Sequence, residues 1–243
     1  MAIDWRRYRA LTFDCYGTLI DWETGLLATL RPWAARHGLA LGDEALLAAF
    51  GEVESRIQRE APRTPYPEVL RASQHALAER LGVAQEQDTA DRVAQSVRDW
   101  PAFPDSPAAL AYLKQHYKLV IVSNVDRASF AHSNRKLGVE FDAIVTAQDV
   151  GSYKPAPAHF HEAFKRLDAL GVPRAEILHV AQSLFHDHVP AKGLGMTTVW
   201  INRRAGKEGW GATRPPEKAV TPDAEFPTLG AVADAHRIAA AGR

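Results

Sequence analysis

The sequence contains a single cysteine, no excess of charge of either sign, and no hydrophobic run long enough to span a membrane. The lone Cys15 excludes an internal disulfide and any metal site built from several cysteines. The 29 basic and 29 acidic side chains cancel, so no overall field attracts nucleic acid or an anionic membrane. The opening residues lack the apolar segment of a signal peptide. We therefore expect a cytoplasmic protein with neither a nucleic-acid nor a membrane partner.

The composition is that of an ordinary globular protein, with 46% hydrophobic and 24% charged residues. A chain of 243 residues is long enough for one large domain, or for a core domain that carries an insert. Any charged ligand must then be recognised by a local group of side chains.

The first apolar segment of the chain begins at Leu11 and ends at Asp14, and we expect it to be a strand. A long helical region follows it. Its hydrophobic residues repeat at helical spacing in three stretches, led by Leu26, Leu46 and Val69. Asp43 is expected to cap the second helix, and another helix is expected through 91–97. The proline-containing stretch 100–107 then breaks the pattern, as a return to another domain would.

Beyond residue 105 short apolar runs alternate with helical patterns. Strands are expected at 119–123, 143–146, 177–181 and 197–201, and helices at 106–116, 127–137, 158–170 and 188–194. This alternation predicts an α/β fold, with a parallel sheet and helices on both faces. We expect a core domain of residues 1–20 and 105–243, an all-helical insert of residues 21–104 after the first strand, and a surface loop at 205–222.

Polar side chains follow four of the expected strands, where parallel strands deliver them to one edge of the sheet. Asp14 ends the first strand and can act as a nucleophile that forms an ester intermediate. The other three groups supply a hydroxyl and an amide, a lysine, and a second carboxylate: Ser123 and Asn124; Lys154; and Gln182, Ser183, His186 and Asp187. Such a set suits hydrolysis through a covalent intermediate.

Four motifs in this order resemble the haloacid dehalogenase superfamily: Asp-x-Tyr-Gly-Thr-Leu from Asp14, Ser-Asn at 123, Tyr-Lys-Pro at 153, and the Asp187 loop. The resemblance implies a Rossmann-like core and makes the helical insert a cap domain. Phosphatases of this superfamily carry a second aspartate where this chain has Tyr16, and an aspartate ligand of Mg²⁺ where it has Gln182. Tyr16 is instead typical of the L-2-haloacid dehalogenase branch, which needs no metal or other cofactor.

The resemblance to this branch implies a role for each motif residue. Asp14 would attack the carbon next to a carboxylate, Thr18 would orient Asp14, and Lys154 would keep it ionised. Asp187 would position or activate the hydrolytic water. The remaining candidates would bind the small carboxylic acid substrate: Ser123 and Asn124 at its carboxylate, and Cys15, Tyr16, Gln182 and Ser183 around it. Strand alternation separately favours a structural role for Cys15. The sequence is compatible with a monomer and with a homodimer.

The sequence departs from the dehalogenase pattern where the halide would be bound. Phe50 occupies the position of the halide-binding arginine, and Phe160 replaces an aromatic hydroxyl. Gln182 replaces a serine, and the expected asparagine nearby is also missing. Entry of Arg56, Arg59 or Arg63 from the same region is the alternative for the halide, against the interpretation of all three as solvent-facing charges.

His186, added before Asp187, has two interpretations: a general base or acid beside the water-activating carboxylate, or a loop residue that bonds to backbone.

The sequence thus predicts a hydrolase of small 2-substituted carboxylic acids, with a 2-haloacid as the first substrate and an aspartyl ester on Asp14. One alternative is cleavage of another bond, such as the ring C–N bond of azetidine-2-carboxylate. A phosphatase and a catalytically silent acid-binding protein are further alternatives. The leaving group and the accepted chirality are not specified by the sequence.

Overall fold

The computed structural model describes residues 3–242 and contains a six-stranded sheet in which every neighbouring pair is parallel. The strand order is β3-β2-β1-β4-β5-β6, so β1 lies inside the sheet. The strands are β1 (Ala10–Phe13), β2 (Lys118–Ser123), β3 (Ala143–Thr146), β4 (Ile177–Ala181), β5 (Thr197–Ile201) and β6 (Ala224–Phe226). The expected α/β fold with a parallel sheet is confirmed.

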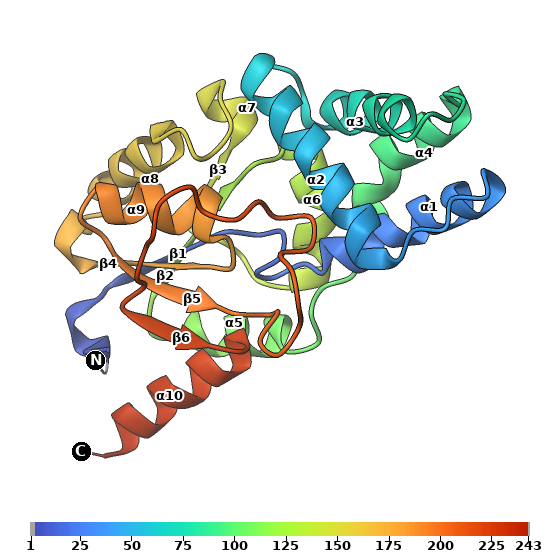
Figure 1. Ribbon diagram of the computed structural model, residues 1–243. Coiled ribbons are helices and arrows are strands. Elements are labelled where there is room, and N and C mark those ends of the chain that lie inside the picture. The colour runs from blue at the N-terminus through green and yellow to red at the C-terminus, as the bar shows by residue number, and fades with distance from the viewer. Residues whose placement is uncertain (1–2, 243) are drawn as a thin grey trace.

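Helices cover both faces of this sheet (Figure 1). On one face Leu11 and Phe13 of β1 share a hydrophobic cluster with α5 (Ser106–Leu113), α6 (Arg127–Leu137) and α10 (Leu229–Ala241). On the other face Ala10 and Val120 belong to a cluster with α8 (Ala158–Ala169) and α9 (Val189–Gly193). Successive residues of a strand point to opposite faces, and both faces are buried, so the strands appear as continuous apolar runs. None of the described helices is long and apolar enough to span a membrane.

Four helices between β1 and α5 lie together at one end of the molecule (Figure 1). They are α1 (Trp22–Arg36), α2 (Asp43–Glu60), α3 (Tyr66–Arg80) and α4 (Gln87–Gln95), and a 3₁₀ turn, Ser96–Asp99, follows them. The chain enters and leaves this group through two adjacent segments, because Asp21 N donates to Pro101 O at 2.8 Å and Phe103 N donates to Leu19 O at 3.0 Å. This arrangement suits an inserted cap, whose limits at residues 21 and 104 stay a prediction.

One local expectation was wrong, and another was incomplete. Asp43 does not cap α2: Gly42 occupies the N-cap position, and the Asp43 carboxylate accepts a hydrogen bond from Arg31 Nε at 2.7 Å. The expected helix at 188–194 is present as α9, but a π-helical turn that was not expected, Leu184–His188, precedes it and continues into it. Ser183 Oγ caps this turn by accepting from His186 N at 2.9 Å. The turn matters for function because it carries Asp187.

Candidate active site

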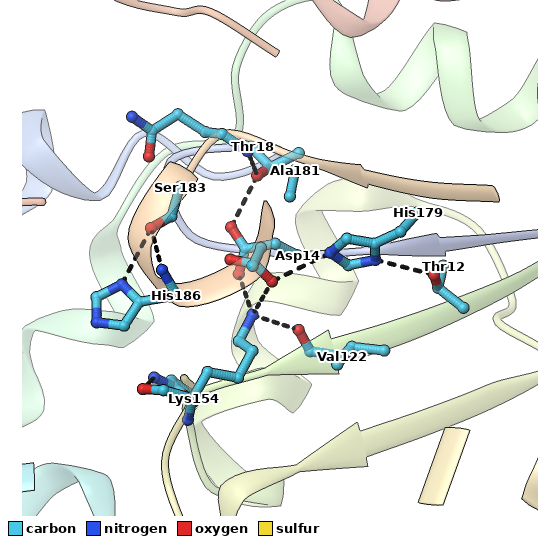
Figure 2. Close-up of polar contacts among 12 residues, drawn as sticks. Thr12, Asp14, Thr18, Val122, Lys154, His179, Ala181, Ser183 and His186 are labelled. Atoms are coloured by element: carbon cyan, nitrogen blue, oxygen red, sulfur yellow. Dashed lines mark hydrogen bonds and ion pairs between the residues drawn. The ribbon is translucent and has the colours of Figure 1, made fainter. Parts of the chain in front are cut away.

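Asp14 lies directly after β1, at the carboxyl end of a strand in the middle of the sheet. The chain then turns sharply at Gly17, whose φ of 89° suits glycine, and Thr18 folds back toward Asp14. Thr18 Oγ1 donates to Asp14 Oδ2 at 2.7 Å and accepts from Gln182 N at 2.9 Å (Figure 2). The Asp14 carboxylate is therefore fixed on one side by a hydroxyl whose own direction is set by the neighbouring strand.

Lys154 holds the other side of Asp14. Its Nζ donates to Asp14 Oδ1 at 2.9 Å, to Asp187 Oδ1 at 2.7 Å and to Val122 O at 2.8 Å (Figure 2). All three ammonium hydrogens thus have an acceptor, which is what a buried ammonium needs. Asn124 in turn fixes the Lys154 backbone, accepting from its N at 2.6 Å and donating to its O at 3.1 Å.

The three charged side chains shift one another's pKa values. Burial raises the pKa of Asp14, and Lys154 opposes that rise. Burial works against the charged forms of Lys154 and Asp187 as well. Even so, the two carboxylates raise the pKa of Lys154, while Lys154 and His179 lower the pKa of Asp187. Lys154 is therefore protonated and Asp187 ionised at neutral pH. Asp14 is the more basic carboxylate, which makes it the better nucleophile once ionised.

A hydrogen-bonded chain supports Asp187 from within the sheet. His179 of β4 lies with Nε2 3.2 Å from Asp187 Oδ1 and Nδ1 2.9 Å from Thr12 Oγ1 (Figure 2). The second carboxylate oxygen, Asp187 Oδ2, is buried and has no hydrogen-bond partner among the described residues. That oxygen is the natural acceptor for a water molecule or a substrate group. Sequence reasoning missed His179, although an imidazole inside the apolar strand Ile177–Ala181 was a visible signal.

The residues around Asp14 do not fit a divalent cation. One oxygen of Asp14 and one of Asp187 are already paired with the Lys154 ammonium, and Gln182 offers no charge. Across residues 3–242 there is no cluster of three or more His, Cys, Asp or Glu side chains able to hold a metal ion. Mg²⁺ sites depend on carboxylate oxygens that face the ion rather than a lysine.

A cavity of about 50 Å³ lies over Asp14. The expected site residues that line it are Asp14, Tyr16, Asn124, Lys154, Ser183, His186 and Asp187. Its other lining residues come from the helices and the late loop: Trp22, Glu54, Gln58, Tyr66 and Thr213. Sequence analysis missed Glu54, Gln58 and Tyr66. A signal existed, because Glu54 and Gln58 follow Phe50 at intervals of four and so share the buried face of α2.

Four expected site residues do not line this cavity. Thr18 acts through Asp14, and Gln182 accepts from Thr213 Oγ1 at 3.3 Å beside the cavity. Ser123 is fully buried, and its Oγ has no partner among residues 3–242. Cys15 belongs to the hydrophobic core, so its substrate-binding assignment requires correction: the thiol packs among apolar side chains, and burial raises its pKa well above the usual value.

Asn124 also departs from its expected role. Its amide lines the cavity, but both polar ends are engaged with the Lys154 backbone, so its side chain serves to place the lysine rather than to hold a carboxylate.

His186 lies at the cavity with Nδ1 3.2 Å from Ser183 Oγ. Burial lowers the pKa of His186 to about 4, so the imidazole is neutral at physiological pH. A neutral imidazole can accept or donate one hydrogen bond, but it carries no extra proton for a leaving group. This favours an orienting role over the acid role considered from the sequence.

No arginine lines the cavity among the described residues. Arg56, Arg59 and Arg63 are all exposed, as expected from the sequence, and Phe50 is fully buried. The loop expected at 205–222 instead contributes to the site: Ala212 packs against α2, and Thr213 reaches the cavity. The end of α2 that faces Asp14 thus offers a carboxyl and an amide in place of a guanidinium.

Comparisons with known proteins agree with this architecture. A family model described as haloacid dehalogenase-like hydrolase matches residues 8–183. An (S)-2-haloacid dehalogenase of Pseudomonas putida is 24% identical over 83% of this chain and 87% of its own length. The haloacid dehalogenase-like hydrolase domain-containing protein 3 of Danio rerio is 32% identical over 45% of each chain.

A crystallised L-2-haloacid dehalogenase superposes with a TM-score of 0.73 at 26% identity, covering 96% of this chain and 99% of its own. The family match over residues 8–183 includes β1 to β4 and, with them, Asp14, Ser123 and Ser183. The chain therefore belongs to the haloacid dehalogenase-like hydrolases and is a hydrolase similar to the (S)-2-haloacid dehalogenases.

Proposed function

We propose that this hydrolase opens a bond between carbon and a leaving atom next to a carboxylate, through an ester on Asp14, with a 2-haloacid as the first substrate. The observation that carries the proposal is the placement of Asp14 between Thr18 Oγ1 at 2.7 Å and Lys154 Nζ at 2.9 Å, at a small cavity. A carboxylate fixed in this way has a defined line of attack on one carbon atom. Similarity to the (S)-2-haloacid dehalogenases supports the haloacid.

The reaction has two steps. In the first, an oxygen of Asp14 forms a bond to the substrate carbon while the bond to the leaving atom breaks. In the second, water adds to the Asp14 carbonyl carbon, and the original oxygen departs on the product as a hydroxyl with one hydrogen of the water. The other hydrogen is released as a proton, which leaves Asp14 ionised. Asp187 Oδ2, buried and without a partner, orients that water, and Lys154 offsets the charge that develops on the Asp14 carboxyl.

A second candidate function is opening of a ring C–N bond, as in azetidine-2-carboxylate. It is favoured by one observation: Glu54 lines the cavity, whereas no arginine among the described residues does. A phosphatase is disfavoured because Gln182 offers no charge to a cation and residues 3–242 hold no cluster of three or more His, Cys, Asp or Glu side chains able to bind one. Burial also raises the pKa of Tyr16 well above the usual value, which makes Tyr16 a poor acid at neutral pH.

The test is turnover of (S)-2-chloropropionate, azetidine-2-carboxylate and p-nitrophenyl phosphate, with and without Mg²⁺, by the wild type and by Asp14→Asn. The proposal requires product from one of the acids, no effect of a chelator, and loss of turnover in Asp14→Asn. Single turnover in ¹⁸O-labelled water should place the label in Asp14. Metal-dependent phosphate release without action on the acids would overturn the proposal. If the wild type shows no turnover and Asp14→Asn still binds the acid, the protein is a binding protein.

A further inference from the structure

Glu54 is a buried carboxyl that faces the nucleophile's cavity and that the two steps above do not use. It belongs to α2, is 5% exposed and lines the cavity together with Asp14. Tyr66 of α3 donates its hydroxyl to Glu54 Oε1 at 2.9 Å. Glu54 Oε2 accepts no hydrogen bond from any residue within 3–242. It is not one of the completely buried side-chain atoms that lack a partner, so it is open to the cavity. One oxygen of this carboxyl is therefore held, and the other is left for a ligand.

The surroundings of Glu54 contain no cation that pairs with it. Gln58 on its own helix is neutral, and the titratable groups of other elements that interact with Glu54 are the hydroxyls of Tyr66 and Tyr153. Tyr16 lines the same cavity, and its hydroxyl is bonded to Ser133 Oγ. Within the described residues no lysine, arginine or histidine forms an ion pair with Glu54, and its pKa responds to burial and to Tyr66 alone. Burial raises the pKa of Glu54 to about 7, against the opposing effect of the Tyr66 hydrogen bond.

The remaining charged or titratable groups of the cavity are Asp14, Asp187, Lys154 and His186. Lys154 is shared between the two aspartates, and His186 is neutral. The cavity thus holds three carboxyl groups against one ammonium. A leaving group that departs as an anion gains nothing from Glu54, because it needs a cation or several N–H donors. A leaving atom that carries a proton, above all a nitrogen, complements it in charge.

We propose that Glu54 is the catalytic residue that binds a leaving nitrogen and shares a proton with it, so that the site opens, besides 2-haloacids, small carboxylic acids whose carbon next to the carboxylate bears a ring nitrogen. The inference rests on the proposed function, since Asp14 still breaks the bond. It deepens that function by adding a second leaving group and the residue that serves it.

The protons balance over the two steps. Glu54 and the substrate nitrogen together hold one proton, on either partner, when Asp14 attacks. The C–N electron pair moves to the nitrogen, which departs as an amine with that proton and leaves Glu54 ionised. The water that hydrolyses the ester gives its oxygen to Asp14, one hydrogen to the product hydroxyl and one to Glu54, which restores the starting state.

The experiment compares azetidine-2-carboxylate with (S)-2-chloropropionate in the wild type, Glu54→Gln and Glu52→Gln. Glutamine keeps the size of Glu54 and can still accept from Tyr66, but it cannot share a proton with an amine. We expect kcat/KM for ring opening to fall by about 100-fold or more in Glu54→Gln, the size usual for loss of an acid or base. Turnover of the chloroacid should stay the same or rise. Glu52 is an exposed residue of α2, so its variant should match the wild type on both substrates.

An equal loss on both substrates in Glu54→Gln would make Glu54 merely structural and would overturn the inference. If that variant does not fold, the wild type alone decides, because a wild type that turns over the chloroacid but not the ring substrate also overturns it. Neither result affects the ester on Asp14. The proposed function itself fails separately, if Asp14→Asn retains turnover or Asp14 never acquires ¹⁸O.

Discussion

Lys154 Nζ lies 2.9 Å from Asp14 Oδ1, and both side chains are buried. In Lys154→Met, Asp14 would lose the charge that opposes the effect of burial, and its pKa would rise further. We expect kcat to fall by roughly 10³-fold, since a protonated carboxyl is a poor nucleophile and the ester step loses its cation. Steady-state turnover of the preferred acid measures this.

The matched control is Lys192→Met, which removes a partly exposed lysine paired with Asp223 at 2.8 Å. We expect kcat within about twofold of the wild type, because a surface pair contributes little. Full activity of Lys154→Met would mean that Asp14 is ionised by another group, which would contradict the role given to Lys154.

His179 offers a test of the second chemical step. His179→Phe keeps a ring in the core but removes the contacts to Asp187 and Thr12. Asp187 then loses one of its two supports, a loss on the order of 1–3 kcal/mol for a buried charged acceptor. We expect ester hydrolysis to slow by about tenfold while ester formation is spared. Intact-protein mass spectrometry at steady state should show accumulated ester, absent from the exposed control His161→Gln. A uniform loss of both steps would contradict this.

The core was predictable from the sequence because its signals are local. Each buried strand is an apolar run that ends in a turn, so β2 to β5 were found to within a residue, and Asp14, Lys154 and Asp187 follow strands as parallel topology requires. Strand β6 was missed because it has three residues at the edge of the sheet, with Glu225 exposed and no apolar run.

The part of the cavity that α2 and α3 line could not be predicted in the same way. Glu54 and Tyr66 reach Asp14 only because α2 and α3 pack over the sheet edge, and helical periodicity shows which residues share a face but not what that face meets. The role of Asn124 was likewise hidden, since its hydrogen bonds to Lys154 join residues thirty positions apart.

Gly51 determines how closely the late loop approaches α2. A Cβ at this position would lie 2.0 Å from the carbonyl oxygen of Ala212, which is backbone and cannot rotate away. Gly51→Ala should therefore displace the loop and move Thr213 from the cavity, at a cost of roughly 1–3 kcal/mol in stability. We expect KM to rise several-fold, measured together with the midpoint of urea unfolding.

The control for Gly51→Ala is Gly193→Ala at the end of α9, where an added Cβ meets nothing within 4 Å. Alanine is the better helix former, so this variant should be as stable as the wild type or more stable, with unchanged KM. If Gly51→Ala behaved like the control, the close approach of the loop to α2 would be irrelevant to binding.

Glu54 also predicts how stability changes with pH. Its pKa rises from an ordinary 4.5 to about 7 on folding, so between these values the folded state binds more protons than the unfolded state. The wild type should lose stability as pH rises through this window, by at most roughly 3 kcal/mol, and the loss should be constant above it. Glu54→Gln lacks this titration. We expect the variant to gain stability over the wild type between pH 4.5 and pH 8, measured as the difference in free energy of urea unfolding at each pH.

Buried His159 and His188, whose pKa values fall to about 3 and about 4, titrate in both proteins and cancel in that difference. A difference that does not change with pH would mean that Glu54 is ionised throughout, and a carboxyl without a proton at neutral pH could share one only if the substrate brought it.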